Sequence, residues 1–134
     1  MLVKTTPLGP DEAITALREA VAAENMRVVH HINGQANARI IGRDVPADQI
    51  LEIFRPDFAI RVWAAHKPAG IDIPLRIHVY VDAEGGTTVQ CRMPREVFAP
   101  YGSDALMAVA DDLEAVFAAI LAAVPEAEHA GAVS

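Results

Sequence analysis

The sequence predicts an α+β fold: a single-domain, antiparallel-dominated sheet with helices packed on one face. Three observations predict it. The chain has 134 residues, 52% of them apolar, which suits one self-sufficient core. Apolar and polar residues alternate through 74–93 on either side of a Gly-Gly pair, as in a β-hairpin. Apolar residues recur at intervals of three and four before and after this hairpin, as in amphipathic helices.

The expected order of elements is approximately β-α-β-β-α-β-β-α within residues 1–125. The elements are a weak strand at 2–5, a helix at 11–24, strands at 26–33 and 49–54, a short helix at 56–66, the hairpin at 74–93 and a long helix at 103–124. A strand is the alternative for residues 56–66. Residues 34–48 have two alternatives: a loop with a short helix, or a short strand. Residues 94–102 are expected to form a connecting loop because they contain two prolines. The small, polar residues 126–134 are expected to form a flexible tail.

The first and last helices have the clearest signals. Pro10 stands where a helix begins, and Ile14, Leu17 and Val21 then form one apolar stripe. Ser103 is a good N-cap for the last helix, because its hydroxyl can accept a hydrogen bond from a free backbone N–H group. The wide apolar stripe that follows predicts a helix that packs on the core.

The register of the hairpin follows from the requirement that both apolar sets face one core. A three-residue turn at 84–86 meets this requirement and places Val79 opposite Cys91. On the other face, it places Tyr80 opposite Gln90 and His78 opposite Arg92.

The polar face of this hairpin is the candidate ligand-binding surface. Strict alternation puts His30 and His31 on opposite faces of their strand, and His31 is expected to join the polar face together with Glu52. The candidate residues are therefore His78, Arg92, Tyr80, Arg76, Gln90, His31 and Glu52. Three interpretations stay open: a solvated face, a dimer interface and a small-molecule site.

Composition excludes some classes of function. The formal net charge is −7, which argues against nucleic-acid partners and anionic membranes, since both need clustered Lys and Arg. No apolar run suits a signal peptide or a membrane span, so a cytoplasmic location is expected. Cys91 is the only cysteine, so an intrachain disulfide is impossible, and its place on the apolar face predicts a small buried hydrophobe.

Three segments resemble the bacterial domain-of-unknown-function family 302. They are the strand 26–31 after the first helix, the run Ile53-Phe54-Arg55-Pro56-Asp57-Phe58-Ala59, and residues 70–80 leading into the hairpin. The likeness extends from about residue 11 to residue 124, and it implies a compact α+β domain that forms a dimer. Many members carry Pro-Cys where this chain has Pro74-Leu75, so thiol chemistry at that position is not carried over, and no catalytic residue is transferred.

Three functions follow as hypotheses, with the cofactor unknown. The first is a non-enzymatic, homodimeric module that binds a small ligand or a partner. The second is a haem- or metal-binding redox accessory protein with His31 or His78 as a ligand, although the chain lacks the spacings of known zinc sites. The third is an enzyme with His78 as general base and Arg92 as anion holder, where Arg92 directly opposite would favour the neutral imidazole.

Overall fold

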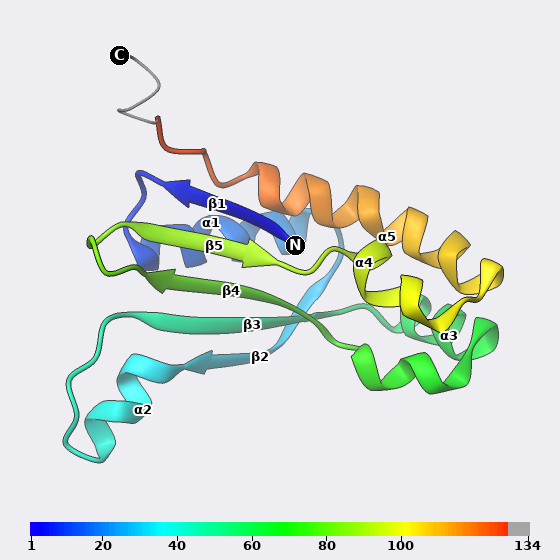
Figure 1. The fold of residues 1–134 in the computed structure, drawn as a ribbon, viewed down its shortest axis with the longest axis horizontal. Coiled ribbons are helices and arrows are strands. Elements are labelled where there is room, and N and C mark those ends of the chain that lie inside the picture. Colours follow the sequence, from blue (N-terminus) through cyan, green and yellow to red (C-terminus); the bar gives the residue numbers. More distant parts are fainter. Residues whose placement is uncertain (129–134) are drawn as a thin grey trace.

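A five-stranded antiparallel sheet is the centre of the fold. A computed structural model describes residues 1–128 (Figure 1). The strands are β1 (Leu2–Thr6), β2 (Arg27–Asn33), β3 (Asp48–Phe54), β4 (Leu75–Val81) and β5 (Thr87–Cys91). They lie in the order β1-β5-β4-β3-β2, and every neighbouring pair is antiparallel. The predicted fold class is confirmed.

Helices cover one face of this sheet. The α-helices are α1 (Pro10–Ala23), α2 (Gly34–Ile40), α3 (Pro56–Ala65), α4 (Pro94–Phe98) and α5 (Asp104–Ala122), and the 3₁₀ helices are η1 (Lys67–Asp72) and η2 (Ala99–Tyr101). α5 contacts α1, α3 and α4, and these helices form the second layer of the molecule (Figure 1). α2 lies outside this layer, beside β3, and none of its residues is buried. Within residues 1–128, no helix has the length and apolar character needed to cross a bilayer.

The core lies between the helices and the apolar face of the hairpin. Ile77 and Val79 of β4 are completely buried, as is Phe117 of α5. The alternation that predicted this face is therefore confirmed. α5 begins as predicted, because the Oγ of Ser103 accepts a hydrogen bond of 3.1 Å from the backbone N–H of Leu106.

The hairpin has the predicted faces, but its register differs by two residues. His78 pairs with Gln90, Tyr80 with Thr88 and Val79 with Val89. The predicted pairs His78–Arg92, Tyr80–Gln90 and Val79–Cys91 are therefore wrong. The carboxylate of Asp82 explains the difference. Its Oδ1 accepts hydrogen bonds from the N–H groups of residues 84 and 86, at 3.0 and 2.9 Å. The turn therefore begins one residue earlier, and Gly85 takes the position with positive φ (85°).

A β-bulge in β2 breaks the predicted alternation of that strand. The register shifts between Val28 and His30, so His30 pairs with Glu52 and His31 pairs with the buried Leu51. His31 therefore lies on the helix-covered face, and its expected place beside His78 is wrong. The extra residue, Val29, is 49% exposed, as expected for a bulge, where one side chain has no partner across the ladder.

Two connecting segments contain more helix than predicted. Residues 94–102 are not a plain loop, because they form α4 and η2. Pro94 occupies the first helical position of α4, where the missing N–H group costs nothing. The open alternative for residues 34–48 resolves as the short helix α2, and the side chain of Asn33 accepts from the N–H of Ala36 to cap it.

The predicted tail divides into two parts. The N–H of Ala127 donates a 2.7 Å hydrogen bond to the carbonyl of Thr5, so residues near 127 run along the outer edge of β1. Residues 129–134, which belong to the tail predicted to be flexible, lie outside the described residues.

Candidate functional site

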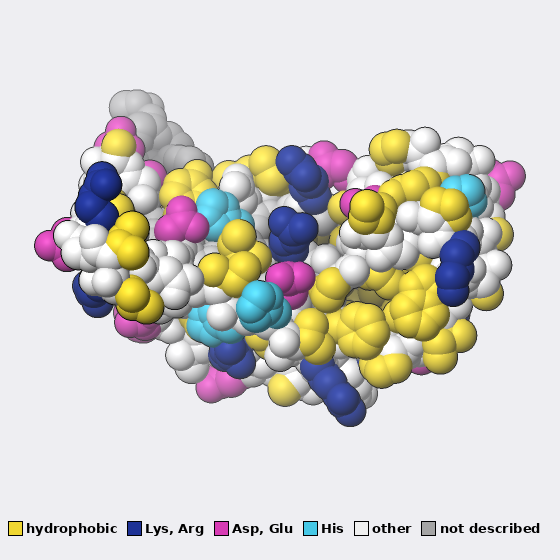
Figure 2. All heavy atoms as spheres, turned by 90° about the horizontal axis from the view of Figure 1, so that it is seen from below, with side chains coloured by type: hydrophobic (Ala, Val, Ile, Leu, Met, Phe, Trp, Pro, Cys, Tyr) yellow, Lys and Arg dark blue, Asp and Glu magenta, His cyan; other side chains and the backbone are white. Residues whose placement is uncertain are grey.

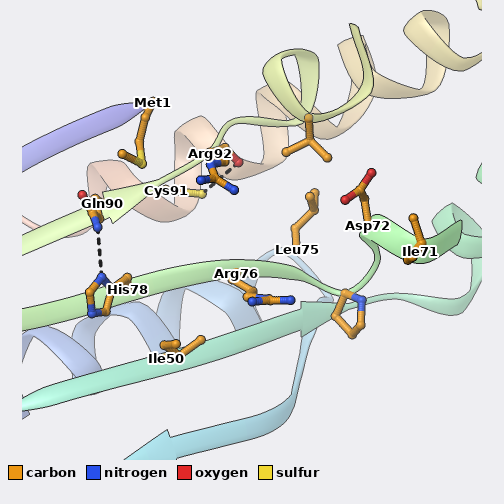
Figure 3. A pocket seen from close by; sticks show the side chains of 12 residues that line it. Met1, Ile50, Ile71, Asp72, Leu75, Arg76, His78, Gln90, Cys91 and Arg92 are labelled. Carbon is orange, nitrogen blue, oxygen red and sulfur yellow. Dashed lines mark hydrogen bonds between the residues drawn. The ribbon is translucent and has the colours of Figure 1, made fainter. Parts of the chain in front are cut away.

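The sheet face opposite the helices contains a pocket with a volume of about 310 Å³. The pocket lies where β4 begins and β5 ends, and η1 and α4 form its walls (Figure 3). Its size is within the range of small-ligand sites. Its lining residues are Met1, Ile50, Ile71, Asp72, Pro74, Leu75, Arg76, His78, Gln90, Cys91, Arg92 and Val97.

Four of the predicted residues meet in this pocket. Arg76 and His78 come from β4, Gln90 comes from β5, and Arg92 follows the end of β5. All four extend from the open face because side chains alternate along each strand. The sequence pattern thus places these side chains correctly, although their cross-strand pairs differ from the prediction.

The other three predicted residues lie outside the pocket. Tyr80 stacks on His78, with ring centroids 4.8 Å apart and planes inclined by 26°. Glu52 lies on the open face as predicted, and its carboxylate bonds to Nδ1 of His30 at 3.1 Å. His31 lies on the opposite face, as described above.

Hydrogen bonds fix the orientation of the His78 ring. Nε2 lies 2.8 Å from the carboxylate Oδ1 of Asp48, and Nδ1 lies 3.0 Å from the amide Nε2 of Gln90. An amide nitrogen only donates and a carboxylate only accepts, so these contacts assign the Nε2–H tautomer to His78. His78 is thus an oriented polar group at one end of the pocket.

Among the described residues that line the pocket, Asp72 is the one carboxylate, and the cationic side chains are Arg76 and Arg92. Both side chains are exposed, and within residues 1–128 neither guanidinium group forms an ion pair. The nearby carboxylates are engaged elsewhere. Asp72 accepts a hydrogen bond from the hydroxyl of Tyr101, Asp48 bonds to His78, and Glu52 bonds to His30. Glu52 lies directly across from Arg76 on β3, but within residues 1–128 neither it nor Asp72 forms an ion pair with Arg76 or Arg92, so both guanidinium groups are available to a ligand.

Sequence reasoning missed the apolar walls of the pocket. Ile50 is part of the open face of β3, and the alternation of residues 49–54 was sufficient to find it. Ile71 and Val97 come from η1 and α4, two short helices that had no periodic signal. His30 also joins the open face, but only through the bulge, for which the sequence of β2 gave no sign.

The histidines that were candidates for metal binding are engaged in hydrogen bonds. Nδ1 of His31 accepts from the guanidinium of Arg18 at 2.7 Å, and its Nε2 donates to Gln49 at 2.6 Å. Both nitrogens of His78 are also bonded. A metal or haem iron needs a free imidazole lone pair, so it would have to break one of these bonds. Within residues 1–128, no group of three or more His, Cys, Asp or Glu side chains has the arrangement of a metal site.

Cys91 lies beside the pocket but is only 2% exposed. Burial raises the pKa of its thiol to about 12, and the negative charges of Glu114 and Glu96 add to this effect. Because the thiolate is the reactive form, Cys91 is an inert thiol near neutral pH. The predicted buried, hydrophobic role is consistent with this environment.

Comparisons with known proteins agree with the resemblance found in the sequence. No curated protein matches the chain. A solved structure described as an uncharacterized conserved protein DUF302 from Bacillus stearothermophilus is 25% identical and has a TM-score of 0.83, covering 92% of this chain and 97% of that chain. The family model described as domain of unknown function DUF302 matches residues 2–124. Since this match spans almost all of the sheet and helices described above, the chain belongs to the DUF302 family.

Proposed function

We propose that this chain is a non-enzymatic binding module and that its pocket between β4 and β5 holds a small oxyanion. The observation that carries the proposal is the pair Arg76 and Arg92, which line one pocket without ion-pair partners in residues 1–128. Guanidinium groups match carboxylate and phosphate oxygens geometrically and bind them with charge-assisted hydrogen bonds. His78 and Gln90 supply further polar atoms at the same site.

The test is an NMR titration of the ¹⁵N-labelled protein with butanoate and, separately, with inorganic phosphate. Saturable shifts of the backbone signals of Arg76, Gln90 and Arg92 are expected. Arg92→Gln is expected to weaken binding tenfold or more, because a hydrogen bond to a charged group contributes about 1.5–3 kcal/mol. Arg43→Gln is the matched control, since Arg43 is exposed and does not line the pocket. Shifts that fail to saturate, or equal losses in both variants, would contradict the proposal.

The proposal includes self-association through the open face of the sheet. Two apolar side chains support it: Val3 of β1 is 53% exposed there, and Ile50 contributes further apolar area. A second copy would cover this surface and add a wall to the pocket. Sedimentation equilibrium is expected to give a dimer that Val3→Glu dissociates, whereas Ile40→Glu, at an exposed site on α2, leaves it intact. A strict monomer at high concentration would argue against this part.

An enzyme with His78 as general base is the second candidate, and the Asp48–His78 contact favours it. A carboxylate that orients an imidazole is a recurring arrangement in proton-transfer sites. Here Nδ1 faces Gln90, so the amide would have to turn away before the ring could accept a proton. Hydrolysis of p-nitrophenyl butyrate decides between the two: the binding module gives only the background rate, whereas turnover lost in His78→Gln would favour the enzyme.

Haem or metal binding through His31 or His78 is the weakest candidate, because it requires the loss of a hydrogen bond that the fold supplies. Titration with haem tests it directly. A saturating Soret band that disappears in His78→Ala or His31→Ala would support it, and an unchanged spectrum would remove it.

A further inference from the structure

We propose that the ligand of this pocket is a single-chain amphiphile. Its oxyanion head group binds Arg76 and Arg92, and its apolar chain leaves the pocket over Ile71. This inference rests on the proposed oxyanion site and goes beyond it, since it specifies what is attached to the anion and in which direction the attachment runs.

Polar and apolar side chains are distributed unevenly along the pocket. The hydrogen-bonded pair His78–Gln90 lies at one end, beside the apolar side chains of Met1 and Ile50, and the two arginines come next (Figure 3). The other end, toward η1 and α4, is formed by apolar side chains, with one carboxylate among them. These residues are Ile71, Pro74, Leu75 and Val97, together with Asp72. A purely polar anion would leave this apolar end in contact with water.

The carboxylate at the apolar end does not disturb this division. Asp72 accepts a hydrogen bond from the hydroxyl of Tyr101, which turns its charge toward η2. The same contact raises the pKa of Tyr101, because the carboxylate favours the protonated phenol. Asp72 is therefore bound to Tyr101, and within residues 1–128 it forms no ion pair with an arginine.

The apolar surface continues beyond the pocket. Ile71 is 84% exposed at the pocket mouth, although isoleucine is usually buried. The indole ring of Trp63 lies directly beside Gly70, where an added Cβ atom would come within 3.1 Å of it. Trp63 is 40% exposed and Ile60 is 59% exposed, so α3 and η1 share an apolar end surface. Figure 2 shows hydrophobic side chains gathered at this end of the molecule.

An extended chain fits this arrangement better than a compact apolar group. A compact group would stay within the pocket, whereas a chain can leave it over Ile71 and reach the exposed apolar side chains of α3. Two sources of head group share the required chemistry: an alkyl carboxylate and an alkyl phosphate. Both present oxygens that guanidinium groups can bind.

The experiment is isothermal titration calorimetry of the full chain with acetate, butanoate, hexanoate and octanoate, with octanamide and octyl phosphate as separate arms. Affinity is expected to rise about fourfold for each methylene that leaves water. Octanamide, which lacks the charge, is expected to bind at least tenfold more weakly than octanoate. The ratio of octanoate to octyl phosphate identifies the head group.

A pair of variants tests the direction of the chain. Ile71→Ser is expected to lower the affinity for octanoate several-fold and to leave the affinity for acetate unchanged. Ile40→Ser is the matched control, because Ile40 is 82% exposed on α2 and does not line the pocket. Both variants replace exposed side chains, so neither is expected to destabilise the fold.

The outcomes separate this inference from the proposed function. Carboxylate affinity that does not depend on chain length, or octanoate binding that is unchanged in Ile71→Ser, overturns the amphiphile. If short carboxylates or phosphate still bind through Arg92 in that case, the oxyanion site stands. If no member of the series binds, both proposals are wrong.

Discussion

The thiol of Cys91 makes the stability of the fold depend on pH in the alkaline range. Cys91 points into the helix-covered core from β5, and its pKa is raised from the ordinary 9.0 to about 12. An unfolded chain releases this proton near pH 9, whereas the folded chain keeps it. The unfolded state therefore binds fewer protons between about pH 9 and about pH 12, and stability falls as pH rises through that window.

The size of the effect follows from the two pKa values. At about pH 10.5, ionisation stabilises the unfolded state by about 2 kcal/mol and the folded state by almost nothing, taking about 1.36 kcal/mol for each pKa unit. This loss is a large fraction of the free energy of unfolding of a typical domain, about 5–15 kcal/mol.

The assay is guanidinium unfolding of the wild-type chain and of Cys91→Ala at pH 7 and pH 10.5. Tyrosines and lysines also titrate in this range, but they contribute equally to both proteins. At pH 7 the variant is expected to be less stable, because it leaves a small cavity. At pH 10.5 the difference in free energy of unfolding between the two proteins is expected to be smaller by about 2 kcal/mol. A gap of constant size would refute the argument that burial controls this thiol.

Three further substitutions test the fold, each by guanidinium unfolding at neutral pH. Asp82→Ala is expected to cost about 1–3 kcal/mol, because it leaves two turn N–H groups without their acceptor; an unchanged midpoint would mean that the carboxylate does not set the turn. Ser103→Ala removes the cap of α5 and is expected to cost about 1 kcal/mol, most of which Ser103→Asp restores. Phe117→Ala opens a cavity under the sheet and is expected to cost about 3–5 kcal/mol, so a loss below about 1 kcal/mol would contradict its complete burial.

Much of the fold is predictable because its strongest signals are periodic. α5 combines a capping serine with a long apolar stripe, and both are properties of the local sequence. β4 alternates over its whole length, so its buried and open faces follow directly. The short helices α2, α4 and η1 have too few turns to show a period, and the apolar walls of the pocket come from two of them. The sequence pattern therefore could not predict that the site is concave.

The two errors in strand register had different consequences for the site, and the reason is geometric. In the hairpin, the turn began one residue early, which moved every cross-strand pair by two residues and left each side chain on its predicted face. In β2, the bulge inserted a single residue, so every later side chain changed face and His30 replaced His31. An even shift changes which residues pair, whereas an odd shift changes which residues can reach a ligand at all. This is why Arg76 and Arg92 were found in the pocket despite a wrong pairing, while His31 was not.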